Sequence, residues 1–472
     1  MELNRVGEVV WELARSHRPD MRVPVRVLAD DVLIEQIRCD HSLTQLVNVA
    51  TLPDIARFAI GMPDMHEGYG FPVGGVAATR LPDGVVSPGG IGFDINCGVR
   101  LLASDVALAT VNSVERVVHE LSRSIPTGYG RHGRLELSPE QMDRVLTEGA
   151  SYVVRERGLG REDDLEHTES KGRLPGASAS SVSERAKQRG HDQLGTLGGG
   201  NHFLEVQVVD EVFDAAAGTA LGLRRGELTV LLHTGSRGLG HQVCTDHVRI
   251  MDAVHAKYRI ELPDRQLACA PLSSPEGRDY FGAMCAAANF AWANRQVLTH
   301  RVRDVFVRTV GRGTDLRVVY DVAHNIAKIE ALGDGKVCVH RKGATRAFGP
   351  SSDELPARYR GIGQPVFIPG SMGTASFVMV GLDASAEVSF ASACHGAGRA
   401  LSRSAAKHRV AGATLRRELE AAGIVVRCPS NEELAEEAPL AYKDVERVVD
   451  VVQRAGIARK VARLKPLGVL KG

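Results

Sequence analysis

Apolar and polar positions along this chain form short blocks that alternate with glycine-rich loops. A β-type apolar run at 25–29 precedes helical spacing of apolar positions over 31–38 and 42–49. Further β-type runs adjoin loops that carry histidine or basic residues, at 99–102, 228–232, 316–320, 337–339 and 365–368. A sheet that holds functional side chains on its loops produces this arrangement.

Longer helical patterns occupy the stretches between these strands. Apolar spacing predicts helices at 111–125, 138–155, 277–311, 392–407 and 443–464. The polar, glycine- and serine-rich stretch 157–190 is interpreted as a surface excursion. Because the sequence has no internal repeat and no clear linker, we predict one large domain over residues 1–472. Its class is mixed α/β, with strands that end in glycine-rich site loops and with helical insertions.

Composition restricts the possible partners. The chain has 472 residues, 43% hydrophobic and 24% charged, which is typical of soluble globular proteins. Its net charge is +1, so any binding of a polyanion must depend on local clusters of basic residues. The eight cysteines are scattered, with no CxxC pair, and no signal-peptide or membrane-span pattern is present. We therefore expect a reduced, cytoplasmic protein without a membrane partner.

The stretch Ser87–Arg100 combines closely spaced glycines with Asp94 and Cys97. Glycines at this density indicate a shaped turn. A carboxylate and a thiolate held together suit a borderline divalent metal, and a thiolate can bridge two metals. In isolation, such a cysteine is more often a small buried apolar residue, and such an aspartate a turn residue.

Three histidines in similar settings favour the metal interpretation. His202, His233 and His324 each adjoin a predicted strand and a loop. With Asp94 and Cys97 they give five candidate ligands, enough for two metals that keep open, catalytic positions. Ordinary surface or core roles are expected for His17, His41, His119, His132, His167, His191, His247, His255, His300 and His408, whereas His66, His241 and His340 stay undecided.

Three glycine-rich loops, 198–201, 369–373 and 396–399, are of the kind that cradles phosphate, although none matches a P-loop or dinucleotide fingerprint. His395 directly precedes the third loop, at a predicted helix start. An imidazole can attack phosphorus if a neighbour fixes its tautomer, and Asp64 is a candidate neighbour. His395 as a further metal ligand or a helix cap is the alternative.

Basic residues gather in or beside these loops, at Arg189, Arg237, Arg341, Lys342, Arg346, Arg399 and Arg403. This local cluster predicts a polyanionic substrate. Few aromatic residues are interleaved with it, so readout of sequence by base stacking is not indicated.

These stretches resemble the RtcB family of RNA-splicing ligases along essentially the whole chain. The motifs that carry the resemblance are Gly92-Phe-Asp-Ile-Asn-Cys-Gly-Val-Arg100, Gly200-Asn-His-Phe-Leu-Glu205, His233-Thr-Gly-Ser-Arg-Gly-Leu-Gly-His241, Asp321-Val-Ala-His-Asn325, His340-Arg-Lys-Gly-Ala-Thr-Arg346 and His395-Gly-Ala-Gly-Arg399. The resemblance implies the distinctive RtcB-type fold. It also implies a ligase dependent on GTP and Mn²⁺ that joins RNA ending in a 2′,3′-cyclic phosphate or 3′-phosphate to RNA with a 5′-hydroxyl, in tRNA splicing or RNA repair.

The resemblance also assigns roles to individual residues. Cys97 would bridge two Mn²⁺ ions, with Asp94 and His202 on one and His233 and His324 on the other. His395 matches the histidine that becomes guanylylated before an RNA 3′-diphosphoguanosine end forms, and Asp64 matches the carboxylate that orients it. GTP contacts would fall on Asn201, His202, Phe203, Leu204, Glu205, His324, Asn325, Pro369, Gly370, Ser371, Met372, Ser376, His395, Gly396, Ala397, Gly398 and Lys471.

The implied partners are RNA, met by Arg189, Arg399 and Arg403, GTP, and an archease-like activating protein. The chain departs from common family residues at Met65, Glu67, Gly199 and Ala393, none of which is a predicted ligand. Two other functions are alternatives. A dinuclear metallohydrolase such as a cyclic phosphodiesterase needs the same five ligands but no covalent nucleotide. A non-catalytic RNA-end-binding protein with a structural metal needs no nucleophile and no open coordination position.

Overall fold

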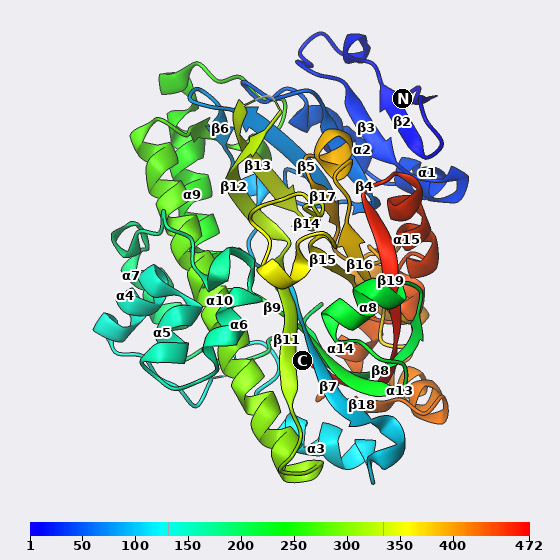
Figure 1. Cartoon of the computed structure of the whole chain (residues 1–472). Coiled ribbons are helices and arrows are strands. Elements are labelled where there is room, and N and C mark those ends of the chain that lie inside the picture. Colours follow the sequence, from blue (N-terminus) through cyan, green and yellow to red (C-terminus); the bar gives the residue numbers. More distant parts are fainter. Residues whose placement is uncertain (131, 334) are drawn as a thin grey trace.

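Two large β-sheets, surrounded by helices, make up the architecture (Figure 1). The computed structural model describes residues 1–130, 132–333 and 335–472. The predicted mixed α/β class is confirmed. Three predicted elements have the bounds that the sequence pattern gave: Asp31–Arg38, Ser42–Val49 and Pro365–Ile368.

The first sheet contains the N-terminal strands. In the described residues its strand order is β1-β2-β3-β4-β5-β13-β12. These strands are β1 (Asn4–Arg5), β2 (Val10–Leu13), β3 (Val25–Leu28), β4 (Ala59–His66), β5 (Val73–Arg80), β13 (Gly335–Lys342) and β12 (Asn325–Leu332). β4 carries Asp64 near its end, so this sheet positions one of the predicted catalytic residues.

The predicted metal ligands lie in or directly beside strands of the second sheet. Over the described ranges its order is β11-β7-β9-β8-β19-β16-β15, and β18 also pairs with β19. The strands are β11 (Leu316–Ala323), β7 (Gly98–Ala107), β9 (Glu227–Thr234), β8 (Phe203–Val212), β19 (Ala458–Lys471), β16 (Ser376–Gly381), β15 (Pro365–Ile368) and β18 (Val425–Arg427). β9 is buried almost throughout, as its apolar run predicts, and ends at His233-Thr234.

His324 joins the two sheets. β11 of the second sheet ends at Ala323, and β12 of the first sheet begins at Asn325. A small sheet adjoins this corner, in which β14 (Ala344–Arg346) pairs with β17 (Ser392–Cys394). The backbone N–H of Ala344 donates to the carbonyl of His324 at 3.1 Å. Since β17 leads directly to His395, the corner brings the predicted nucleophile near a predicted ligand.

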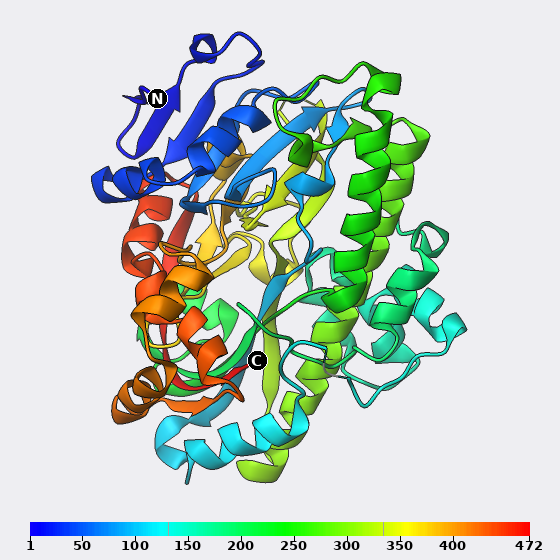
Figure 2. The ribbon, with the colours of Figure 1, turned by 180° about the vertical axis from the view of Figure 1, so that it is seen from behind.

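Helices cover the outer faces of the sheets, and α9 and α10 run side by side along one flank (Figures 1 and 2). The helices are α1 (Asp31–Arg38), α2 (Ser42–Val49), α3 (Val114–Ser124), α4 (Pro139–Glu148), α5 (Ala150–Arg155), α6 (Glu162–Glu166), α7 (Glu184–Gly190), α8 (Ala215–Leu221), α9 (Arg237–Tyr258), α10 (Pro275–Thr309), α11 (Ser385–Ser389), α12 (Arg403–Arg409), α13 (Gly412–Ala421), α14 (Asn431–Glu436) and α15 (Val445–Arg454). α10 is buried over most of its 35 residues and carries polar groups towards the strand ends.

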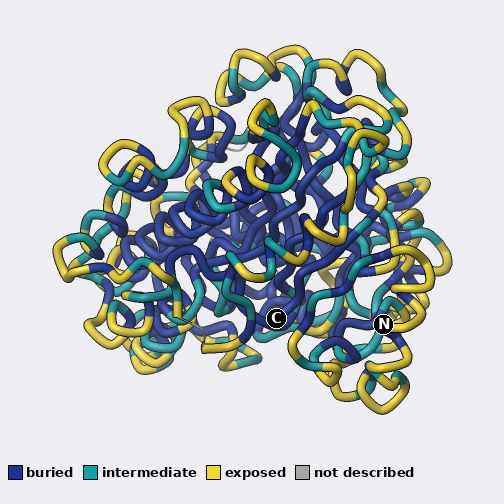
Figure 3. Tube along the Cα trace, turned by 90° about the horizontal axis from the view of Figure 1, so that it is seen from below, coloured by how far each residue is buried: buried dark blue, intermediate teal, exposed yellow. Residues whose placement is uncertain are grey.

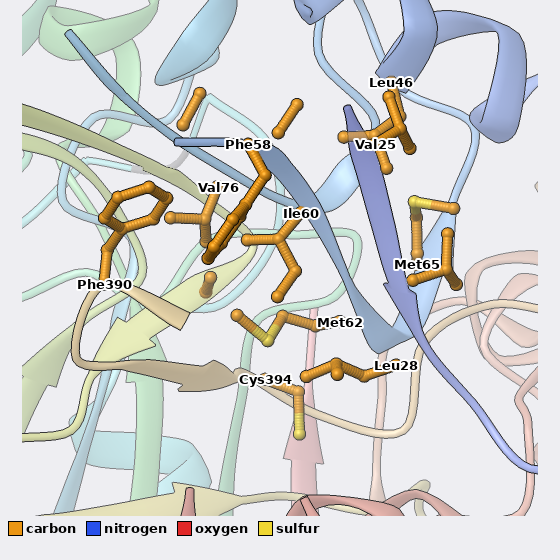
Figure 4. Close-up of a cluster of buried hydrophobic side chains, with 14 of the residues drawn as sticks. Val25, Leu28, Leu46, Phe58, Ile60, Met62, Met65, Val76, Phe390 and Cys394 are labelled. Atoms are coloured by element: carbon orange, nitrogen blue, oxygen red, sulfur yellow. The ribbon is translucent and has the colours of Figure 1, made fainter. Parts of the chain in front are cut away.

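The buried chain lies in the middle of the molecule, and exposed segments form its periphery (Figure 3). One apolar cluster surrounds β4, where Ile60 and Met62 pack with residues of β3, β5 and the segment 390–394 (Figure 4). Phe390 and Cys394 belong to this cluster. The cluster therefore fixes the segments that carry Asp64 and His395 relative to each other.

Two predicted helices are interrupted or end earlier than their apolar spacing suggested. The helix predicted at 138–155 is divided into two helices, α4 and α5. Gly149 between them has a φ of 62°, and a Cβ there would lie 2.2 Å from the carbonyl oxygen of Gly172. The tail predicted as largely helical over 443–464 is helical only to Arg454. Gly456, with a φ of 73°, follows α15, and β19 begins at Ala458.

Two further predictions were wrong. Residues 392–407 are not one helix, because Ser392–Cys394 forms β17 and α12 begins only at Arg403. Gly398, with a φ of 74°, packs against the backbone of Asp64. The polar stretch 157–190 is not only a surface excursion, since Asp164 and Glu169 are buried and paired with cations of α10 and β12. In the described part of the chain, no helix is long and apolar enough to cross a membrane.

Candidate active site

The five predicted metal ligands lie together where strands of the second sheet begin and end. Asp94 and Cys97 precede β7, His202 precedes β8, His233 lies in β9, and His324 lies between β11 and β12. Their ligand atoms form two groups, one of Asp94, Cys97 and His202 and one of Cys97, His233 and His324. Within each group, these atoms all lie within 4.8 Å of one another. Cys97 belongs to both groups.

Distances between the ligand atoms indicate what the cluster can hold. Sγ of Cys97 lies 3.4 Å from Nε2 of His202 and 3.2 Å from Nε2 of His233. Nε2 of His202 is 2.7 Å from Oδ2 of Asp94, and the Nε2 atoms of His233 and His324 are 3.2 Å apart. Convergent imidazole, thiol and carboxylate donors at such distances fit borderline divalent cations. The residues therefore fit two cations that share Cys97.

Burial sets the protonation of these donors. It lowers the pKa of His233 and of His324 well below the ordinary histidine value, so both imidazoles are neutral at pH 7 and offer lone pairs. Burial and the Asp94 carboxylate raise the pKa of the Cys97 thiol. A bound divalent cation would oppose that shift, because it stabilises the thiolate.

A buried guanidinium holds the backbone beside three of the ligands. Arg295 of α10 donates at 2.8 Å to the carbonyl of Asn96, which precedes Cys97, and at 2.8 Å to the carbonyl of Thr234, which follows His233. It also pairs at 2.8 Å with Asp321, on the strand that leads to His324. Arg295 and Asp321 have no exposed surface. The helix α10 thus supports ligands from three strands.

His395 and Asp64 form a second feature of the site. Oδ2 of Asp64 lies 2.7 Å from Nδ1 of His395 and accepts the backbone N–H of His395 at 3.1 Å. A carboxylate only accepts, so this contact keeps the proton on Nδ1 and leaves Nε2 with a lone pair. The His395 ring lies 4.8 Å from the ring of His324. His395 therefore lies next to the five predicted metal ligands, called the metal cluster below, but its Nδ1 contacts Asp64 and not those ligands.

His233, His324 and His395 line a pocket of about 320 Å³. Most of the predicted nucleotide contacts line it: Asn201, Phe203, Glu205, His324, Asn325, Pro369, Gly370, Ser371, Met372, His395, Gly396, Ala397, Gly398 and Lys471. Three of the predicted contacts lie behind this lining. His202 is in the metal cluster, the side chain of Leu204 packs in a hydrophobic core, and the hydroxyl of Ser376 accepts a hydrogen bond from Gln207 at 3.1 Å.

Glu205, Glu437 and Lys471 form a part of the pocket lining that we call the far wall, and their ionisable groups are buried. Burial raises the pKa of Glu205 to about 7. Lys471 is 3% exposed, and its Nζ lies 3.6 Å from Oε2 of Glu437. Lys471 is the last residue of β19 and pairs with Phe203 of β8, so a residue beside the C-terminus is part of the wall. In Figure 3 the C-terminus lies among buried segments of the chain.

The three predicted RNA-contacting arginines have different positions. Arg399 and Arg403 line the pocket and pair with Glu437 at 3.2 Å and 3.3 Å. Arg189 lies outside the lining, at the exposed end of α7, where it donates to Gln242 at 3.0 Å.

Sequence reasoning missed several residues that contact the site. Glu437 and Tyr442 line the pocket, and Lys443 lies behind Asp64. Tyr69 and Phe93 line the opposite part. The sequence signal that could have identified Phe93 and Tyr69 is their position within or close to a glycine-rich motif. Glu437 and Tyr442 precede the tail that was predicted as helical over 443–464, and the helical pattern of that tail gave no indication of a role for Lys443.

Comparison with known proteins gives one consistent result. The family model described as tRNA-splicing ligase RtcB matches residues 45–472. The chain is 52% identical to a tRNA-splicing ligase RtcB from Archaeoglobus fulgidus over 478 residues, covering 100% of this chain and 99% of that protein. A tRNA-splicing ligase RtcB from Thermococcus kodakarensis shows the same identity and coverage. An RNA-splicing ligase RtcB from Mycobacterium tuberculosis is 52% identical over 437 residues, covering 91% of this chain and 100% of that protein.

A match over most of the chain, together with relatives of similar length at about half identity, shows the family. The chain therefore belongs to the RtcB family, a family of RNA-splicing ligases.

Proposed function

We propose that this protein joins RNA ends that carry a 2′,3′-cyclic phosphate or 3′-phosphate to RNA ends with a 5′-hydroxyl, using GTP and Mn²⁺. The contact between His395 and Asp64 carries the proposal. Asp64 fixes the tautomer of the His395 imidazole, which leaves Nε2 free to react. His395 lines the pocket and lies beside the two groups of metal-type donors.

The first chemical step uses this nitrogen. Nε2 of His395 attacks the α-phosphorus of GTP, an N–P bond forms, the bond to the β-phosphate oxygen breaks, and pyrophosphate leaves. Asp64 holds the Nδ1 proton and stabilises the charge that develops on the imidazole, as a triad carboxylate does. The product is a guanylylated His395.

Two transfers complete the reaction. A cyclic phosphate is first opened by water to a 3′-phosphate. An oxygen of that phosphate attacks the guanylyl phosphorus and breaks the N–P bond, which restores His395 and leaves an RNA 3′-diphosphoguanosine end. The 5′-hydroxyl of the second RNA then attacks the RNA 3′-phosphorus and expels GMP, and its proton passes to solvent.

Two Mn²⁺ ions would be held by Asp94, Cys97 and His202 and by Cys97, His233 and His324. When bound, such cations supply positive charge to phosphate oxygens and lower the pKa of a bound hydroxyl. The donor chemistry supports this assignment, because every neutral imidazole and the shared sulfur point into the same small volume.

The proposed GTP site uses the lining residues on the far wall. Glu205 and Lys471 offer a carboxyl and an ammonium for a purine edge. The lining segments 369–372 and Gly396–Gly398 are proposed to hold the phosphates, with the backbone N–H groups of Met372, Gly396 and Gly398 as donors. Arg399 and Arg403 are proposed to meet RNA phosphates at the same pocket, and Arg189 at the surface beside it.

A joining assay tests the proposal. We expect RNA with a 2′,3′-cyclic phosphate and RNA with a 5′-hydroxyl to be joined with GTP and Mn²⁺, and to remain separate with ATP or with a chelator. Hydrolysis of the cyclic phosphate without joining, independent of GTP, would instead indicate a metal-dependent phosphodiesterase. Binding without either reaction would indicate a non-catalytic RNA-end-binding protein.

A further inference from the structure

Three aromatic rings from distant parts of the sequence form a row beside the metal ligands. Tyr69 follows β4, Phe93 precedes Asp94, and His241 lies in the first turns of α9. The ring centroids of Tyr69 and Phe93 are 5.2 Å apart at an interplanar angle of 61°. Those of Phe93 and His241 are 4.9 Å apart at 27°, a stacked arrangement. We call these three residues the ring row.

The ring row leads from the pocket to the surface. Tyr69 and Phe93 line the pocket and are partly exposed, whereas His241 is exposed outside it. Rings that serve only a core are normally covered by other apolar side chains. A run of partly exposed flat rings beside a reaction site is instead typical of a stacking surface for planar ligands.

Basic side chains lie near both ends of the row, and burial lowers the pKa of one of them, Lys342, to about 7. In the pocket, Nζ of Lys342 lies 6.0 Å from the centroid of the Tyr69 ring and donates to the Tyr69 carbonyl. At the surface, the positive charge of Arg189 acts on His241. Among the acidic groups nearby, Asp94 acts on His241 and belongs to the predicted metal ligands, and Asp252 and Asp264 act on Tyr69. The row therefore suits a ligand that combines flat rings with phosphates.

We propose that the ring row binds the terminal base of an RNA strand by stacking and so guides that RNA end to the metal cluster. The inference rests on the proposed function for its substrate, RNA, but not on guanylylation of His395. Stacking on ring faces accepts every base, as a ligase for varied RNA ends requires. The row also explains how base stacking can occur although few aromatic residues lie among the basic residues in sequence: the fold assembles it from residues 69, 93 and 241.

A comparison of protein and RNA variants tests this inference. The protein variants are Phe93→Leu, which keeps an apolar side chain but removes the ring face, and His241→Leu. The RNA variants carry an abasic residue at the terminal position of the 3′-phosphate strand or of the 5′-hydroxyl strand. Dissociation constants are measured by fluorescence anisotropy with Mn²⁺ and without GTP, so the result does not depend on nucleotide chemistry.

For the wild type we expect the abasic residue to weaken binding of one strand about tenfold, the effect of losing one base–aromatic stack. Phe93→Leu should weaken the intact strand by a similar factor, and the abasic residue should then add little. His241→Leu should give the same pattern at a smaller factor. Whichever strand shows this coupling is the one that the ring row holds.

Two controls separate stacking from a structural effect. Phe213 is 43% exposed and stacks on Phe377, and Phe213 belongs neither to the pocket lining nor to the ring row, so Phe213→Leu should leave the abasic effect unchanged. The Mn²⁺ affinity of Phe93→Leu, measured by calorimetry, shows whether the substitution disturbs the neighbouring Asp94. If Asp94 is disturbed, His241→Leu still tests the stacking independently. An abasic effect of equal size in the wild type and both ring variants would overturn the inference, as would its absence from both strands in the wild type.

Discussion

At the scale of single residues, the contact of His395 with Asp64 depends on a lysine that the sequence did not indicate. Nζ of Lys443 donates to the carbonyls of Pro63 and Met65, which flank Asp64, and its backbone N–H donates to Gly398, three residues after His395. Lys443 is 6% exposed. It therefore fixes both segments that carry the pair, and its charge lies close to the Asp64 carboxylate.

We predict that Lys443→Met slows formation of the guanylyl adduct about 100-fold, because a small misplacement of Asp64 misdirects His395. Rapid-quench labelling with GTP measures this rate. Joining of RNA that already carries a 3′-diphosphoguanosine end should be nearly unchanged, since that step does not use His395. Equal losses in both steps would mean that Lys443 serves only the stability of the fold.

Cys97 is the residue common to both groups of metal-type donors. We predict that Cys97→Ser loses both Mn²⁺ ions together, because a neutral hydroxyl cannot replace a shared thiolate. Elemental analysis of dialysed protein measures the occupancy. His202→Ala is the matched variant and should reduce chiefly one ion, since His202 belongs to one group. Retention of one full ion in Cys97→Ser would contradict the bridging role.

At the scale of elements, β19 delivers Lys471 to the pocket wall through pairing with β8. Removal of Lys471 and Gly472 should reduce guanylylation at least tenfold, because the wall loses its ammonium beside Glu205 and Glu437. The melting temperature should change little, since Glu437 keeps its contacts with Arg399 and Tyr442. Full labelling of the truncated protein would remove Lys471 from the nucleotide site.

The elements also show how far the sequence could predict the fold. Short helices with clear caps, such as Asp31–Arg38 behind Asp30, have the predicted bounds, because the signal is local. β19 was missed because the apolar spacing of 443–464 continues past Gly456, where α15 has ended, and because β19 pairs with distant strands. In α4 and α5 the apolar spacing continues across Gly149, whose positive φ is required by a close approach to Gly172.

The residues of the candidate site also fall into those that the sequence could predict and those that it could not. Asp94, Cys97, His202, His233 and His324 could be predicted because each lies in a distinctive glycine-rich or strand-end setting. Their supports could not. Arg295 lies in the middle of a long helix, Lys443 in a tail, and the ring row is assembled from three separate segments. Such residues are defined by contacts between segments that lie apart in the sequence, which a local pattern does not reveal.

At the scale of the whole molecule, the metal cluster lies where the two sheets meet. His324 connects β11 to β12, and Arg295 ties β11 to the ends of β7 and β9. A cation bound here links these parts only in the folded state. Mn²⁺ at about 1,000 times its dissociation constant should therefore stabilise the protein by about 4 kcal/mol.

Thermal unfolding at increasing Mn²⁺ concentration measures this stabilisation. His324→Ala should lose the part of the Mn²⁺ dependence that the second donor group supplies, because that group then lacks its corner residue, whereas Asp94, Cys97 and His202 remain. His119→Ala, on the exposed surface of α3, is the matched control and should respond as the wild type does. A full response in His324→Ala would place the cation elsewhere.

The proposed function requires that His395 carries the guanylyl group during RNA joining. Incubation with α-³²P-GTP and Mn²⁺, followed by denaturing electrophoresis, tests it most directly. We expect a covalent label on the wild type that is lost in acid and survives alkali, as an N–P bond on histidine does. We expect no label on His395→Ala, which should still bind Mn²⁺. A label that persists in His395→Ala, or an unlabelled wild type that nevertheless joins RNA, would contradict it.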